Sequence, residues 1–342
     1  MAPPATGMML TSPEAPSVIA RLSEMPWLTG LQRYHQRLAA LRAGRTFTRL
    51  PSDSFRSVWE GLQGANPALE QWRHLFIQEA RAMARGQGEN RLTILIGDSL
   101  TFAFPSEILP GGRFWLNQGI SGENTSQILH RLSAAAAVKP HAIYILAGIN
   151  DLRQGSSDRQ VVNNLRRIIR DLQQQHPAAQ IIIQSILPTR FDALPGERID
   201  GLNQALKGMV RTQAASYFDL NAYFRNSLGK LQLALTTDGL HLSLAGYQVW
   251  QQALHIAETR IMNGRDEAYQ QWLRRTDYFV LEGRKYHWGR HQVQLGETLE
   301  MLANASFGHS DVYYSDLIAI RNDFHLSTLT PNQIIDLPNP VT

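Results

Sequence analysis

The sequence contains no cysteine, and this absence removes several kinds of chemistry at once. Without a thiol the chain can form no disulfide, bind no metal through thiolate ligands and use no cysteine nucleophile. The eleven histidines include no H-E-x-x-H pattern, so we expect no metal site. The lack of cysteine leaves the redox compartment open.

Long hydrophobic runs and runs of like charge are also missing. No apolar run reaches the roughly 20 residues that a membrane-spanning helix needs. The N-terminal segment 1–10 lacks the basic start and the continuous apolar core of a signal peptide, so we expect a cytoplasmic location by default. The net charge of +4 is mild for 342 residues, and the absence of a Lys/Arg run argues against a nucleic-acid partner.

The length is about twice that of a typical domain, and a hydrophobic fraction of 43% is enough for a sizeable core. Composition and periodicity divide the chain into five parts. They predict a disordered Pro-rich N-terminus at 1–15, a helical extension at 16–90, a central domain at 91–262, a linker at 263–288 with a connecting helix at 268–281, and a small C-terminal domain at 289–340.

In the helical extension, apolar residues fall at helical spacing over 31–41, 55–62 and 69–83. Trp59 and Trp72 belong to this pattern and could mark a binding surface. Aromatic residues on an amphipathic stripe are more typical of packing, so we favour a core role for both.

The central domain alternates strand and helix patterns. Near-continuous apolar runs such as 142–147 are typical of parallel strands that are buried on both faces. We therefore predict an α/β fold whose five-stranded parallel sheet is covered by helices on both sides. The expected strands are 92–96, 114–117, 142–147, 180–186 and 216–220, with helices at 125–138, 158–175, 202–214 and 245–261.

The first of these strands ends in Gly97-Asp98-Ser99-Leu100, which places a serine at its carboxyl end. Ligands bind at this edge of open α/β sheets, because loops and helix N-termini converge there. A serine hydroxyl is a poor nucleophile until a neighbouring base takes its proton. Ser99 is therefore a candidate nucleophile only if the chain also supplies a histidine.

Asp238-Gly-Leu-His241 offers such a base together with a carboxylate that could orient it. Gly119 and Asn150 follow the second and third predicted strands, and could donate a backbone N–H and a side-chain amide to an oxyanion. Taken singly, the glycine could equally be a turn residue, the asparagine a helix cap and the histidine structural. Their joint placement favours a site for acyl transfer.

Four blocks in this order resemble the SGNH (GDSL) hydrolase superfamily: 97–100 with Ser99, 118–122 with Gly119, 148–151 with Asn150, and 238–241 with Asp238 and His241. The resemblance covers 91–261 and implies a flavodoxin-like three-layer fold. It also implies that Ser99 is the nucleophile, His241 the base and Asp238 its partner, with an oxyanion hole formed by the Ser99 N–H, the Gly119 N–H and the Asn150 amide, and with no cofactor. The absence of G-x-S-x-G argues against the α/β-hydrolase elbow.

The C-terminal part resembles the LysM glycan-binding module, which has a β-α-α-β order. The resemblance rests on the segments 291–299, 302–303, 317–322 and 329–338. The chain departs from the pattern at His291, where an aromatic residue is usual, at Glu297 in place of Asp, and at Asn332 in place of Gly. Asn tolerates left-handed geometry, so we expect the fold to persist, either for glycan binding or for docking alone.

The leading hypothesis is a serine esterase that acts on a short acyl ester such as an O-acetyl group. An N-acetylglucosamine-containing glycan such as peptidoglycan is then a candidate polymer, and would imply a location in the cell envelope. The first alternative is a lysophospholipase or thioesterase. The second, from another class, is a non-catalytic glycan-binding or scaffolding protein.

Overall fold

The computed structural model describes most of the chain. The described residues are 18–25, 27–45, 50–88, 90–111, 113–262, 274–281, 284–307, 318, 321–322 and 329–341. The segment 1–15, for which the sequence predicts disorder, lies outside them.

The central feature is a five-stranded sheet in the order β2-β1-β3-β4-β5. Each neighbouring pair is parallel, and the order confirms the predicted flavodoxin-like fold. The first and third strands are buried along their whole length, which explains their apolar composition. The strands are β1 (Leu92–Gly97), β2 (Phe114–Gly119), β3 (Ala142–Leu146), β4 (Gln180–Gln184) and β5 (Ser216–Phe218).

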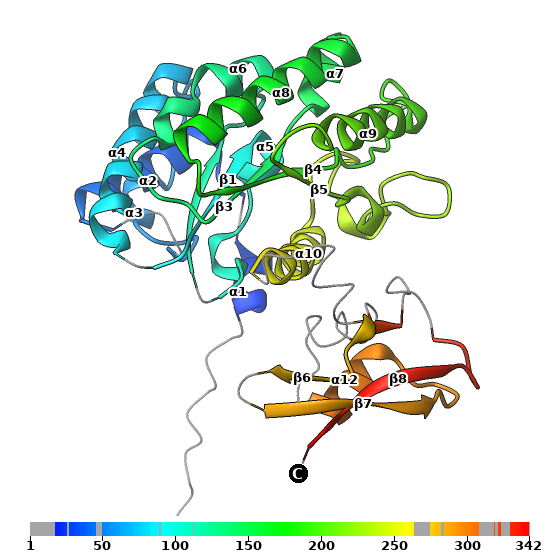
Figure 1. The fold of residues 1–342 in the computed structure, drawn as a ribbon. Coiled ribbons are helices and arrows are strands. Elements are labelled where there is room, and N and C mark those ends of the chain that lie inside the picture. Colours follow the sequence, from blue (N-terminus) through cyan, green and yellow to red (C-terminus); the bar gives the residue numbers. More distant parts are fainter. Residues whose placement is uncertain are drawn as a thin grey trace, which may run out of the picture.

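Helices cover both faces of this sheet, which gives three layers (Figure 1). One face packs on α6 (Thr125–His130), α8 (Asp158–Gln175) and α9 (Gly196–Val210), and the other on α10 (Leu244–Met262). Two short helices, α5 (Ser99–Phe102) and α7 (Ile149–Arg153), follow β1 and β3. The helix predicted at 125–138 is shorter than expected, because Arg131 leaves helical geometry and a 3-10 turn follows at Leu132–Ala135.

The N-terminal helices are α1 (Val18–Glu24), α2 (Gly30–Arg42), α3 (Arg56–Trp59) and α4 (Leu69–Gln87). Trp59 and Trp72 are buried, which confirms the packing interpretation. Trp72 and Phe76 form one hydrophobic cluster with Phe102 of α5 and Ile120. The extension is therefore packed against the carboxyl ends of β1 and β2.

A separate small sheet of three antiparallel strands lies toward the C-terminus, in the order β6-β7-β8. Its strands are β6 (Tyr278–Leu281), β7 (Arg284–Gln292) and β8 (Ile334–Pro340), and α12 (Leu299–Phe307) packs on it. The described members of its hydrophobic cluster all lie between Phe279 and Leu337. Of the helix predicted at 317–322, only residues 318, 321 and 322 are described.

The small sheet begins earlier in the chain than the sequence predicts. The connecting helix expected at 268–281 is wrong at its end, since Tyr278–Leu281 forms β6. Aromatic and β-branched residues favour a strand there, and Phe279 stacks on Tyr286 of β7 with ring centroids 5.4 Å apart. The start of that expected helix, up to residue 273, lies outside the described residues.

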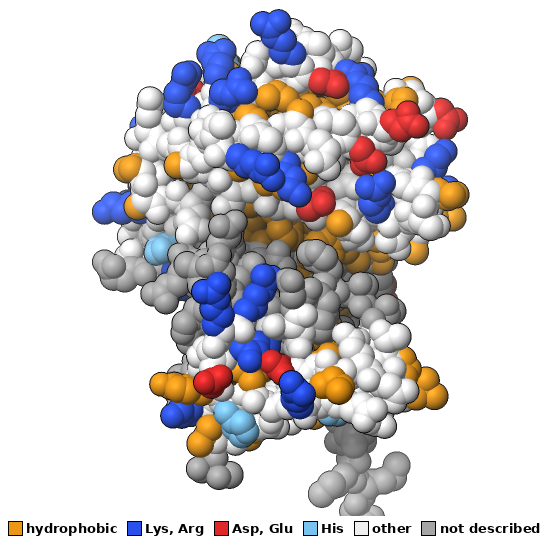
Figure 2. All heavy atoms as spheres, turned by 45° about the vertical axis from the view of Figure 1, so that its right-hand side comes forward, with side chains coloured by type: hydrophobic (Ala, Val, Ile, Leu, Met, Phe, Trp, Pro, Cys, Tyr) orange, Lys and Arg blue, Asp and Glu red, His pale blue; other side chains and the backbone are white. Residues whose placement is uncertain are grey.

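None of the helices in the described part of the chain is long and apolar enough to cross a bilayer. On the face shown in Figure 2, basic and acidic side chains are interspersed over both the large unit, which contains the parallel sheet, and the small unit, which contains the antiparallel sheet. A nucleic-acid site usually presents a continuous basic stripe instead.

Candidate active site

Ser99 is the first residue of α5, directly after the turn that ends β1. Asp98 caps this helix, because its Oδ1 accepts a hydrogen bond of 3.0 Å from the Leu100 N–H. A Cβ at Gly97 would lie 2.4 Å from the Leu146 carbonyl oxygen and 2.2 Å from Thr101 Oγ1. Glycine is therefore required for the close packing of β1 against Leu146 and Thr101 at the sheet edge, where Ser99 retains 9% exposure.

His241 lies in the loop before α10, with its ring beside Ser99. Ser99 Oγ is 3.2 Å from His241 Nε2, and His241 Nδ1 is 2.7 Å from Asp238 Oδ2. The other oxygen of Asp238 accepts hydrogen bonds from the His241 and Leu240 backbone N–H groups, at 2.7 and 2.9 Å. The structure thus brings the three predicted residues into one hydrogen-bonded chain.

The Asp238 carboxyl is held in its ionised form. Burial acts to raise its pKa, but the hydrogen bonds from the His241 ring and from two backbone N–H groups outweigh this effect. The resulting pKa of Asp238 lies below the ordinary value. An ionised Asp238 fixes the proton on His241 Nδ1 and leaves Nε2 free to accept a proton from Ser99.

Asn150 lies in the first turn of α7, after Gly148, whose φ of +127° is accessible to glycine. Asn150 Nδ2 donates to the Glu123 carbonyl oxygen at 3.0 Å, and Asn150 Oδ1 accepts from Arg153 at 3.2 Å. An amide nitrogen carries two N–H groups, so a second one remains for a ligand. The side chain is buried and fixed at both ends.

Gly119 differs from the expectation that its N–H faces an oxyanion. This N–H donates to Asn117 Oδ1 at 2.9 Å. A Cβ at Gly119 would lie 2.3 Å from the Phe102 nitrogen, so the glycine serves a close approach between β2 and α5. The sequence interpretation placed this block at the edge where Ser99 lies, but in the structure the Gly119 N–H is bound to Asn117.

Gly122, which the sequence interpretation did not consider, lies in the same block. It has a φ of +84° in the turn after β2, and among the described residues none accepts a hydrogen bond from its N–H. It precedes Glu123, whose carbonyl oxygen binds Asn150. The available signal was the second glycine in the block Gly119-Ile-Ser-Gly122.

A buried ion pair supports this side of the site. Arg131 Nε binds both carboxylate oxygens of Glu123, at 2.9 and 2.7 Å. Burial raises the pKa of Glu123, and the neighbouring Arg131 opposes that effect. Arg131 Nη2 also lies 3.4 Å from the Gly97 carbonyl oxygen at the end of β1. The pair therefore joins the Glu123 turn to the turn that carries Ser99.

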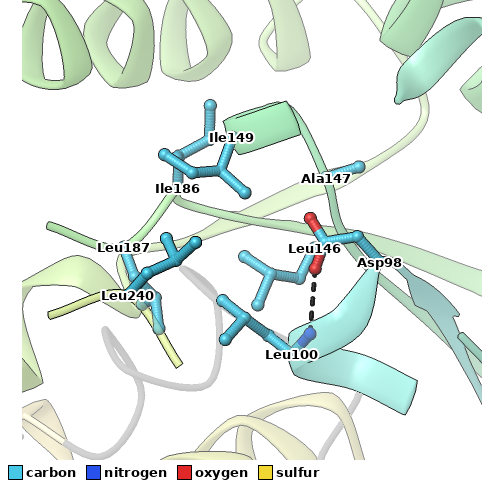
Figure 3. Close-up of a pocket in the computed structure, with 8 residues that line it drawn as sticks. All are labelled: Asp98, Leu100, Leu146, Ala147, Ile149, Ile186, Leu187 and Leu240. Atoms are coloured by element: carbon cyan, nitrogen blue, oxygen red, sulfur yellow. Dashed lines mark hydrogen bonds between the residues drawn. The ribbon is translucent and has the colours of Figure 1, made fainter. Parts of the chain in front are cut away.

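A small, mostly apolar pocket lies among the turns that follow β1, β3 and β4 (Figure 3). Its cavity volume is about 10 Å³, which is far below the usual 300–1,000 Å³ range of drug-sized ligand sites. Three of its lining residues are chain neighbours of candidate site residues: Leu100 follows Ser99, Ile149 precedes Asn150 and Leu240 precedes His241. The pocket is lined by Asp98, Leu100, Leu146, Ala147, Ile149, Ile186, Leu187 and Leu240.

Asp98 is the one acidic side chain of this pocket, and it is almost fully buried. Its Oδ2 has no hydrogen-bond partner among the described residues. Burial raises the pKa of Asp98 to about 7, because the hydrogen bond from Leu100 only partly offsets the loss of water. Within the described residues, no group of three or more His, Cys, Asp or Glu side chains could hold a metal ion.

Comparison with known proteins defines the class. Residues 95–249 match the family model of the GDSL-like lipase/acylhydrolase family. The chain therefore carries an acylhydrolase domain and is an ester-hydrolysing enzyme. Over these residues the match confirms the resemblance to the SGNH (GDSL) hydrolase superfamily.

Individual relatives are distant. The platelet-activating factor acetylhydrolase IB subunit alpha1 of Homo sapiens is 24% identical over 195 residues, which cover 53% of this chain and 81% of that subunit. The chicken (Gallus gallus) alpha2 subunit is 27% identical over 144 residues, 41% of this chain and 62% of that subunit.

Solved structures are similar to about half of the chain. A GDSL-like lipase from Bacteroides thetaiotaomicron is 17% identical with a TM-score of 0.47, and covers 57% of this chain and 100% of its own. Axe2, an acetylxylan esterase from Geobacillus stearothermophilus, is 21% identical with a TM-score of 0.42, and covers 48% of this chain and 92% of its own.

Proposed function

We propose that the protein is a serine esterase that removes a short acyl group through an acyl-Ser99 intermediate. The observation that carries this proposal is the chain of short contacts from Ser99 Oγ to His241 Nε2 and from His241 Nδ1 to Asp238 Oδ2. This arrangement joins a nucleophile, a base and a group that orients the base. If the protein were a non-catalytic scaffold, this chain of contacts between Ser99, His241 and Asp238 would have no role.

In the first half of the reaction, His241 takes the Ser99 proton while Ser99 Oγ attacks the ester carbonyl carbon. The carbonyl oxygen becomes an oxyanion, which accepts hydrogen bonds from the Ser99 N–H, the Gly122 N–H and the Asn150 amide. We assign Gly122 this role because the Gly119 N–H is already bound to Asn117. Collapse of the intermediate expels the alcohol, which takes its proton from His241.

In the second half, His241 deprotonates a water molecule that attacks acyl-Ser99. The acyl group leaves as a carboxylic acid, and the proton returns from His241 to Ser99 Oγ. The ionised Asp238 stabilises the imidazolium in both halves. No cofactor is needed for either half.

The preference for a short acyl chain follows from the pocket. Its walls include Leu100, Ile149 and Leu240, the chain neighbours of Ser99, Asn150 and His241, and they enclose a volume of only about 10 Å³. A longer chain would have to displace buried side chains such as Ile186. The human relative is named an acetylhydrolase, which is the same acyl class.

For the natural alcohol part of the ester, we propose a glycan held by the C-terminal unit. Asn332 has the left-handed φ of 69° that the LysM resemblance requires at this position. His291 Nε2 and Glu297 Oε2, two positions that depart from the LysM pattern, lie 2.8 Å apart and bind each other. The second candidate, a lysophospholipase or thioesterase, is favoured if the pocket accepts long chains.

The test is a panel of p-nitrophenyl esters from acetyl to palmitoyl, beside acetylated N-acetylglucosamine polymers and a lysophospholipid. We expect kcat/KM to be highest for acetyl and to fall by about tenfold or more once the chain exceeds the pocket. Ile186→Ala, which enlarges the pocket, should move the optimum to longer chains, and Ser99→Ala gives the background. Highest activity of the wild type on palmitoyl ester would reject the short-acyl assignment.

A further inference from the structure

The N-terminal extension reaches the strand ends of the central sheet through one buried arginine. Arg37 lies on α2 and is 1% exposed. Its Nη2 donates to the carbonyl oxygen of Asn117 on β2 at 2.8 Å. Its guanidinium is also paired with Glu79 of α4, with Nε 2.8 Å from Oε1 and Nη2 bound to Oε2. One side chain thus joins two helices of the extension to β2.

The partner residue on β2 continues this connection to the candidate site. Asn117 Nδ2 donates to the Thr101 carbonyl oxygen at 2.7 Å, within the short helix that begins at Ser99. Asn117 Oδ1 accepts the Gly119 N–H, which fixes the end of β2 before the Gly122 turn. Both the nucleophile helix and the strand that leads to the oxyanion donors are therefore held by the residue that Arg37 binds.

Packing on the same side is tight. The Arg37 guanidinium lies over the Phe76 ring at 4.8 Å, and Trp72 meets Phe102 edge-on at 5.5 Å. The guanidinium of Arg131, which is paired with Glu123, also lies over the Phe76 ring, 5.4 Å from its centroid. Phe76 of α4 thus contacts both Arg37 and Arg131, and Trp72 of α4 contacts Phe102 of α5.

We propose that Arg37 is a positioning residue for ester hydrolysis, and that the extension from α2 to α4 is a working part of the catalytic unit rather than an attached domain. This inference rests on the proposed function of Ser99. The family model matches residues 95–249 only, so Arg37 and Glu79 lie outside the matched domain. Arg37 acts by holding β2 and α5 at the spacing that places Ser99 Oγ against His241.

Only arginine can make this set of contacts. Its planar fork binds a carboxylate with two nitrogens and still donates to a carbonyl oxygen, whereas lysine offers a single ammonium. Removing Arg37 alone would leave Glu79 buried without its partner, which is strongly destabilising. Replacing both members of a buried ion pair by apolar residues of similar volume is often neutral for stability. The double substitution R37M/E79M therefore removes the contact with Asn117 while it preserves the fold.

The chain contains a matched control at the other edge of the same sheet. Arg113, which precedes β2, forms a buried ion pair with Glu258 of α10. Glu258 also lies 3.4 Å from Thr93 at the start of β1. Strand starts and strand ends lie at opposite edges of a parallel sheet, so R113M/E258M tests the loss of a buried pair away from Ser99.

The experiment measures kcat and KM on p-nitrophenyl acetate, the thermal unfolding midpoint, and the rate at which a fluorophosphonate labels Ser99. We expect R37M/E79M to lower kcat and the labelling rate by about 10- to 100-fold, because small displacements of reacting groups have effects of that size. KM and the unfolding midpoint should stay near wild type. R113M/E258M should leave kcat and the labelling rate unchanged.

Arg37→Lys provides a second variant that keeps a positive charge beside Glu79, and we expect a smaller loss of kcat at unchanged KM. A wild-type kcat and labelling rate in folded R37M/E79M or Arg37→Lys would overturn the inference. An equal loss in R113M/E258M would also overturn it, since the effect would then be general. Retained activity of Ser99→Ala would instead reject the proposed function, so the two failures are distinguishable.

Discussion

The two sheets of the molecule place their motif residues in different ways. In the parallel sheet, Ser99 and Asn150 follow neighbouring strands, and the shared strand direction brings them to one edge together with His241. In the small antiparallel sheet, adjacent strands run in opposite directions, and its motif positions His291 and Glu297 bind each other. A sequence pattern therefore indicates chemistry most directly where the topology forces its parts together.

The strongest way to test this difference is to remove a donor at the edge of the parallel sheet. We expect Asn150→Ala to lower kcat by about 100- to 1,000-fold with little change in KM, because an oxyanion donor acts mainly in the transition state. Steady-state kinetics on p-nitrophenyl acetate measures this. Asn163→Ala, which removes an exposed amide of α8, is the control. A change in KM alone would make Asn150 a substrate-binding residue instead.

Asp98, beside Ser99 at the edge of the parallel sheet, makes the stability of the fold depend on pH. Its folded pKa of about 7 lies above that of an unfolded aspartate, so the folded state binds more protons between pH 4 and 7. Stability is then highest below the unfolded pKa and is lost as the pH rises through 7. Asp98→Asn stays neutral and should stabilise the fold at pH 8, by on the order of 4 kcal/mol at most, but have little effect near pH 4.

Urea unfolding of wild type and Asp98→Asn across this pH range measures that gap. Asp192→Asn is a suitable control, because Asp192 is exposed and pairs only with Lys230 in the described structure. A gap that is constant from pH 4 to 8 would show that Asp98 does not titrate in this range in the folded protein.

The smallest expected effect concerns the second sheet. A chain that ends at Arg265 should keep its kcat on p-nitrophenyl acetate, because the candidate site residues all precede it. The described hydrophobic clusters of the large unit also end before Arg265, and that of the small unit begins at Phe279. Activity on an acetylated glycan polymer should fall, since a tethered binding module raises the local substrate concentration. Equal activity on both substrates would remove the glycan role of the small sheet.

Much of the parallel sheet could be predicted because each buried strand is an apolar run that ends at glycine or a polar residue. Which of Gly119 and Gly122 has an N–H free to act as an oxyanion donor could not be predicted from the sequence, because only the backbone geometry and the hydrogen bond to Asn117 distinguish them. Strand β6 was missed because its pairing with β7 is a tertiary contact. The ion pair between Arg37 and Glu79 joins residues 42 positions apart, so no local sequence pattern predicts it.

The central claim is that Ser99 forms the acyl-enzyme. Its most direct test is mass spectrometry of the protein quenched during turnover of p-nitrophenyl acetate, and after reaction with a fluorophosphonate. We predict one acetyl or phosphonyl group, located on the peptide that contains Ser99, and no label in Ser99→Ala or after removal of the base in His241→Ala. A label on another residue, or undiminished turnover by Ser99→Ala, would contradict the account.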